Sequence, residues 1–121
     1  MKPVIQCIMC DPYLAGIYGR KFEEEGFEVH IDESVDEAMR DASRHRPQAV
    51  LYDIHCTADP AEVIRQMRAH TVLSRAKILL VGSVTDWDRV QELTSLADGY
   101  LIFGHFVPRE AVNKVKHLLS L

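Results

Sequence analysis

The feature that most constrains this chain is a regular alternation of short β-rich apolar runs with longer segments of helical period, repeated five times. A breaker or a helix-capping residue marks each change of period. The apolar runs predict strands over residues 4–10, 27–31, 49–54, 78–81 and 100–103. Strands separated in this way by helices are typical of a parallel sheet between two helical layers. We therefore predict one three-layer α/β domain.

The starts of the helical segments carry readable signals. Asp11-Pro12 and Asp59-Pro60 each combine a capping carboxylate with a proline suited to the first helical position. Ser34 and Glu37 have the spacing of a capping box. Further helices are predicted over residues 86–96 and from Pro108 onward, where apolar residues recur at helical spacing.

Length, charge and hydropathy exclude several classes of protein. With 121 residues, 47% of them hydrophobic, the chain suffices for one core, so we predict a single domain over residues 1–121. A net charge of -4 without a basic stripe argues against direct nucleic-acid binding. No apolar run approaches the roughly 20 residues of a membrane-spanning helix. The chain has three cysteines, an odd number, and it shows no signal-peptide pattern. We therefore expect a cytoplasmic protein whose cysteines are reduced and which does not bind a membrane.

Sites in parallel sheets form at the carboxyl ends of the strands. The residues predicted to lie there are Met9, Cys10, Asp11, Asp53, Ile54, His55, Cys56, Gly82, Ser83, Phe103, Gly104 and His105. Cysteine and histidine suit zinc or copper, but their spacing matches no compact metal motif, so we predict no metal site. Cys7 and Cys10 have the spacing of a redox pair. Residues three apart on a strand point to opposite faces, which argues against a disulfide between them.

Several features in order resemble the receiver domains of response regulators over the whole chain. They are Asp53 at the end of the run 49–53, Asp11-Pro12, the segment 26–29 before the second strand, and the segment 97–101. The resemblance implies a CheY-like, flavodoxin-like (βα)5 fold with a five-stranded parallel sheet, and a role in bacterial two-component (phosphorelay) signalling without enzymatic activity of its own. It also implies that Asp53 is the phosphoacceptor equivalent and that Tyr100 is the aromatic position whose rotamer reports activation.

The chain departs from this family at most positions that carry chemistry. In the family, two acids ending the first strand bind magnesium together with the phosphoacceptor, a hydroxyl residue ends the fourth strand, and lysine followed by proline ends the fifth. The corresponding positions here are Met9 and Cys10 for the acids, Gly82 for the hydroxyl, Phe103 for the lysine and Gly104 for the proline, with Asp11, Ser83 and His55 as polar neighbours.

These departures weaken the expected phosphorylation chemistry. Magnesium prefers oxygen ligands, and a thioether and a thiol do not replace two carboxylates. We therefore predict no cofactor, magnesium being possible only if Asp53 and Asp11 suffice as ligands. We call the place where the family's acids and lysine would lie the vacated pocket; Met9, Cys10 and Phe103 occupy the corresponding positions. We expect the apolar side chains of Met9 and Phe103 to fill this pocket by packing together.

The function predicted from these observations is that of an atypical receiver domain that binds a protein partner, with phosphorylation weak or absent. A histidine kinase, an effector or a second copy of the chain would be the partner. The expected contact face contains Trp87, Tyr100, Phe106 and the last helix, although a helix-start tryptophan also packs locally in many proteins.

Two alternatives stay open. In the first, Asp53 is a working phosphoacceptor for a histidine kinase, with Asp11 and Ser83 as displaced helpers. In the second, the vacated pocket senses a small apolar molecule or a soft metal. Metal dependence of phosphorylation separates the first alternative from the leading interpretation, and elemental analysis tests the second.

Overall fold

The structure is a computed structural model that describes residues 1–103 and 107–121, and of Phe103 only the backbone. One parallel sheet has the strand order β2-β1-β3-β4-β5. Its strands are β1 (Val4–Ile8), β2 (Glu28–Asp32), β3 (Ala49–Asp53), β4 (Lys77–Ser83) and β5 (Gly99–Phe103). The helices are α1 (Pro12–Glu24), α2 (Val35–His45), α3 (Pro60–Ala69), α4 (Trp87–Leu93) and α5 (Pro108–Leu118). The predicted flavodoxin-like architecture is confirmed.

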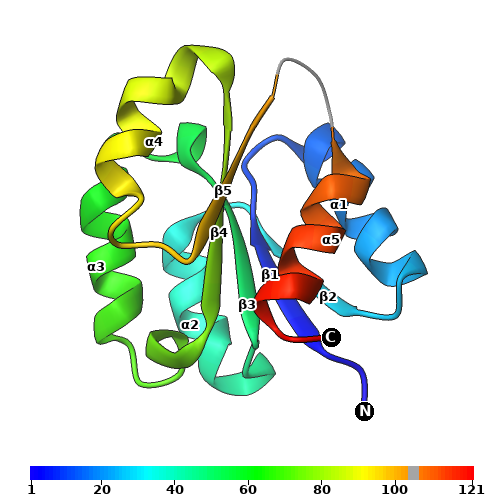
Figure 1. Cartoon of the computed structure of the whole chain (residues 1–121). Coiled ribbons are helices and arrows are strands. Elements are labelled where there is room, and N and C mark those ends of the chain that lie inside the picture. Colours follow the sequence, from blue (N-terminus) through cyan, green and yellow to red (C-terminus); the bar gives the residue numbers. More distant parts are fainter. Residues whose placement is uncertain (104–106) are drawn as a thin grey trace.

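Helices cover both faces of the sheet: α1 and α5 lie on one side, and α2, α3 and α4 on the other (Figure 1). Alternate residues of each strand supply the two cores. Leu51 packs on the α1–α5 side, and its neighbours Val50 and Tyr52 pack on the opposite side. Because the central strands are buried on both faces, they read as continuous apolar runs. Among the residues that the structure describes, no helix combines the length and the apolar character needed to cross a membrane.

The predicted caps are present at three helix starts. The Asp11 carboxylate accepts a hydrogen bond from the Tyr13 N–H at 2.9 Å, and the Asp59 carboxylate accepts one from the Glu62 N–H at 3.2 Å. The Ser34 hydroxyl accepts the Glu37 N–H at 3.2 Å. The Glu37 carboxylate reaches back to the N–H of Glu33 at 3.2 Å rather than to that of Ser34, so the capping box is shifted by one residue at its return bond.

Four predicted boundaries differ from the structure in ways that matter for the site. β1 ends at Ile8 and not at Cys10, so the last two residues of that prediction lie in the turn before α1. β3 ends at Asp53, because Ile54 opens a short 3₁₀ turn. β4 continues to Ser83, because its last residues pair with β5. The fourth helix is shorter than the predicted range 86–96, and a 3₁₀ turn over Val84–Asp86 precedes it.

A network centred on Arg68 and Asp98 ties three segments together. The Arg68 guanidinium, on α3, donates to the Ala76 carbonyl at 2.9 Å, to the Leu96 carbonyl at 3.2 and 3.3 Å, and to the Asp98 carboxylate at 2.8 Å. The same Asp98 oxygen accepts the N–H of Ile78 at 2.7 Å. This Arg68–Asp98 network therefore fixes α3 and the connection before β5 to the start of β4.

Candidate functional site

Asp53 ends β3, between β1 and β4, and only 6% of its surface is exposed. Its carboxylate accepts the His55 N–H at 3.0 Å, and the His55 Nδ1 lies 3.8 Å from the same oxygen. Burial is the largest influence on the Asp53 pKa and raises it above the ordinary value, against the lowering effect of His55. The nearby carboxylates of Asp86 and Asp11 raise it further. The site thus disfavours the charged form of this carboxyl.

Asp86 forms the second acidic element of the site. Its Oδ2 accepts the Ser83 N–H at 2.7 Å and the Ser83 hydroxyl at 3.0 Å, and it lies 2.5 Å from the His55 Nε2. Burial raises the pKa of Asp86, but the hydrogen bonds from Ser83 and the interactions with His55 outweigh burial, and the net pKa is lowered. The His55 ring therefore lies between two carboxylates, with a short contact to Asp86 and a longer one to Asp53.

Asp86 was absent from the residues that the sequence predicted for the site, although Ser83 and Asp86 have capping-box spacing. Gly82 allows the close approach of its carboxylate. A Cβ at position 82 would lie 3.3 Å from the Asp86 Oδ2, closer than such contacts normally come. The predicted hydroxyl position thus holds a glycine that leaves room for a carboxylate from the following turn.

Two cysteines meet beside Asp53. The Cys10 N–H, in the turn after β1, donates to the Cys56 Sγ at 2.8 Å, and the two side chains are close enough to influence each other. Burial, together with the Cys10 thiol, raises the pKa of the Cys56 thiol to about 12, although the Cys10 N–H opposes this. Cys10 is exposed and Cys56 is half-buried. Cys7 lies in the core, where burial raises its pKa to about 12, so it belongs to no redox pair with Cys10.

The residues around Asp53 do not fit magnesium. Met9 is only 1% exposed and packs in the α1–α5 core, and Cys10 offers sulfur. The Asp11 carboxylate is engaged as the cap of α1. Within residues 1–103 and 107–121, no three His, Cys, Asp or Glu side chains converge as a metal site. The donor set lacks the cluster of oxygen ligands that magnesium requires.

Part of the predicted site lies outside the described residues. Gly104, His105 and Phe106 belong to this part, as does the side chain of Phe103, whose backbone pairs with Ser83. The predicted filling of the vacated pocket by Met9 and Phe103 therefore stays a prediction.

An aromatic pair marks the predicted partner face. The rings of Trp87 on α4 and Tyr100 on β5 meet edge to face, with centroids 5.9 Å apart and planes at 63°. Trp87 is 43% exposed and Tyr100 36%, and the exposed Val84 lies in the turn before α4. Three apolar side chains are therefore presented to solvent along this edge of the sheet.

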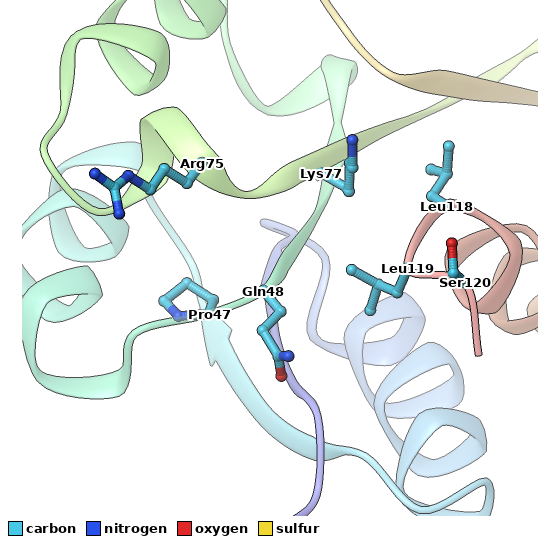
Figure 2. Close-up of a pocket in the computed structure, with 7 residues that line it drawn as sticks. All are labelled: Pro47, Gln48, Arg75, Lys77, Leu118, Leu119 and Ser120. Carbon is cyan, nitrogen blue, oxygen red and sulfur yellow. The ribbon is translucent and has the colours of Figure 1, made fainter.

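A hollow at the amino ends of the strands is separate from the site around Asp53. This open hollow has a volume of about 470 Å³. Figure 2 shows the residues that line it, which are Pro47, Gln48, Arg75, Lys77, Leu118, Leu119 and Ser120. Gln48 precedes β3 and Lys77 opens β4, so the hollow lies at the amino ends of the strands. Asp53 lies at the carboxyl ends, and the two features share no residue.

Solved structures with the same arrangement of elements define the class. A response-regulator receiver domain from Bermanella marisrubri superposes with a TM-score of 0.86 at 23% identity, covering 98% of this chain and 99% of its own. The chemotaxis protein CheY4 of Vibrio cholerae gives 0.85 at 17% identity, with 97% and 98% covered. The receiver domain of the sensor histidine kinase PA1611 of Pseudomonas aeruginosa, which has magnesium coordinated in its active-site cleft, gives 0.84 at 20% identity over both whole chains. The fold is that of CheY-like receiver domains.

Sequence similarity points to the same group, although no family model matches the chain. The transcriptional regulatory protein PrrA of Mycobacterium tuberculosis is 38% identical over 95 residues, and the PrrA of Mycobacterium bovis matches equally. The match covers 78% of this chain and 40% of each relative, so the chain spans less than half the length of these curated relatives. In fold and in sequence, the chain is therefore similar to the receiver domains of response regulators.

Proposed function

We propose that this chain is an atypical receiver domain of bacterial two-component signalling that acts by binding a protein partner, with phosphorylation of Asp53 weak or absent. The observation that supports this function best is the composition of the site around Asp53. The carboxylate is buried and bonded to the His55 N–H, and the turn after β1 supplies Met9 and Cys10 where the resemblance calls for acids.

Transfer of a phosphoryl group depends on positive charge that neutralises the equatorial oxygens. The carboxylates near Asp53 are already engaged: that of Asp11 caps α1, and that of Asp86 accepts from Ser83. The His55 ring contacts Asp86 at 2.5 Å, so any charge that it carries is already paired with a carboxylate. Asp53 is thus poorly equipped to accept a phosphoryl group.

The proposed mode of action is therefore regulated binding. The partner would be a histidine kinase, an effector or a second copy of the chain, met in the cytoplasm, and the exposed aromatic pair supplies an apolar contact point. The domain needs no enzymatic activity of its own for this role. Any output of a longer protein would come from segments beyond the matched 95 residues.

Incubation with acetyl phosphate, with and without magnesium, followed by intact-mass spectrometry tests the proposal. We expect no phosphate adduct, because Met9, Cys10 and Phe103 stand where the resemblance calls for two magnesium-binding acids and a lysine. The receiver domain of PA1611, which coordinates magnesium in its active-site cleft, is the parallel control for the reagent. An adduct that requires magnesium and disappears in Asp53→Asn would establish Asp53 as a working phosphoacceptor and replace our proposal with that function.

Removing the exposed aromatic pair tests the partner face. We expect Trp87→Ala with Tyr100→Ala to weaken self-association, or binding to the cognate histidine kinase, by roughly 30-fold, since a buried aromatic anchor contributes about 2 kcal/mol. Sedimentation and calorimetry measure the two affinities. Ile31→Thr is the matched control, because Ile31 is exposed on β2 at the other edge of the sheet. Equal affinities for the double variant and the control would place the partner face elsewhere.

A further inference from the structure

The contact between Cys10 and Cys56 is a feature that phosphorylation and partner binding leave unused. The two residues are 46 positions apart, and the fold brings them together because β1 and β3 are neighbours in the sheet (Figure 1). Each cysteine lies in the connection that follows its strand at the carboxyl edge. They form a pair of reduced thiols directly beside Asp53.

Their geometry suits a covalent bond. The Cys56 Sγ lies 2.8 Å from the Cys10 backbone nitrogen, which brings the two side chains close enough to interact. Both residues lie outside the strands, in the two connections that this hydrogen bond brings together. A disulfide, which has a specific geometry, therefore requires adjustment only within two loops, and the sheet can stay as it is.

We propose that Cys10 and Cys56 are a reversible redox pair, which a small-molecule disulfide such as oxidised glutathione converts to an intrachain disulfide. The exposed Cys10 reacts first: its thiolate attacks one sulfur of the glutathione disulfide, forms a mixed disulfide and releases one glutathione thiolate, which takes up a proton. Cys56 then loses its proton to solvent and attacks the Cys10 sulfur, which releases the second glutathione. Two thiols of the chain are oxidised and one glutathione disulfide is reduced.

The order of these steps follows from the different exposure of the two cysteines. Cys56 is half-buried, whereas Cys10 is accessible to the oxidant. During the second step, the Cys10 N–H stabilises the negative charge that develops on the Cys56 sulfur. The product ties the turn after β1 to the turn after β3, and so fixes the two loops that flank Asp53. This inference does not depend on whether Asp53 accepts phosphate.

Oxidation of the full chain with oxidised glutathione, followed by denaturation and iodoacetamide labelling, tests the pair. The reduced chain has free cysteines at positions 7, 10 and 56, so we expect three labels before oxidation and one, on Cys7, afterwards. Intact mass should fall by two hydrogen atoms without retained glutathione. Non-reducing peptide mapping of the wild-type chain should link Cys10 to Cys56, and dithiothreitol should reverse the bond.

Three variants sharpen the test. Cys56→Ser should retain glutathione on Cys10, because no resolving thiol remains, and Cys10→Ser should form no intrachain bond. Cys7→Ala should form the disulfide as the wild type does. A wild-type chain that stops at the glutathione adduct, forms a bond through Cys7, or links to a second chain would overturn the proposal. Peptide mapping of the wild type decides the matter even where a variant fails to fold.

Discussion

Asp98→Ala is expected to lower the free energy of unfolding by about 3 kcal/mol, because the Ile78 N–H loses its acceptor and the Arg68 guanidinium loses its carboxylate partner. One Asp98 oxygen accepts the Ile78 N–H at 2.7 Å and the Arg68 guanidinium at 2.8 Å. The Ile78 side chain is fully buried, so the backbone at this position cannot move outward to find another acceptor. Urea denaturation followed by circular dichroism measures the loss.

Two controls separate the hydrogen bond from the charge. Asp98→Asn keeps an oxygen for the Ile78 N–H and loses only the ion pair with Arg68, so we expect a loss of about 1 kcal/mol. Asp88→Ala removes an acid from the first turn of α4 and should change stability by less than about 0.5 kcal/mol. If Asp98→Ala were as stable as Asp88→Ala, the two hydrogen bonds that the Asp98 carboxylate accepts would contribute nothing to the stability of the fold.

Asp86→Ala is expected to cost about 2 kcal/mol of stability, since it removes the acceptor for the Ser83 N–H and hydroxyl and the partner of His55. The same urea experiment applies. Ser83→Ala is the matched variant, because it removes the hydroxyl and leaves the backbone bond, and it should cost less. If Asp86→Ala lost no more unfolding free energy than Ser83→Ala, the interactions of the Asp86 carboxylate with His55 and with the Ser83 N–H would not stabilise the fold.

The contribution of the Asp86 charge to the free energy of unfolding depends on pH, and its direction follows from the pKa shift. Its folded-state pKa is lower than the ordinary value of 3.8, so the charge stabilises the fold above that value and the benefit disappears as pH falls through the folded pKa. The difference in unfolding free energy between wild type and Asp86→Asn should therefore shrink below about pH 4. Asp53 has a raised pKa, so its contribution has the opposite sign: it is largest at low pH and is lost as pH rises. A difference for Asp86→Asn that grows on acidification would contradict this assignment.

Much of the fold could be predicted because its signals are local. The capping carboxylates of Asp11 and Asp59 act within three residues of themselves, so the sequence around each one is sufficient. The predicted end of β4 was wrong because Gly82 and Ser83 have weak strand propensity. These two residues belong to the strand because they pair with β5. That pairing is a contact between distant segments, which a local pattern does not contain.

The residues of the site could likewise be predicted only in part. The position of Asp53 at the carboxyl edge followed from the strand pattern, and the structure places it there. The role of Asp86 could not be read from the sequence, because it depends on His55 from another loop and on the missing side chain at Gly82. The contact of Cys10 with Cys56 likewise arises only once β1 and β3 lie side by side.

The burial of Met9 limits which residues position 9 can hold. Its side chain packs among the α1–α5 core residues and is almost fully enclosed. An acid at this position would place a carboxylate in an apolar environment, at a cost of several kcal/mol unless a cation and its other ligands were bound beside it. An engineered metal site at this edge of the sheet would therefore need several residues changed together, because the first acid introduced alone would destabilise the fold.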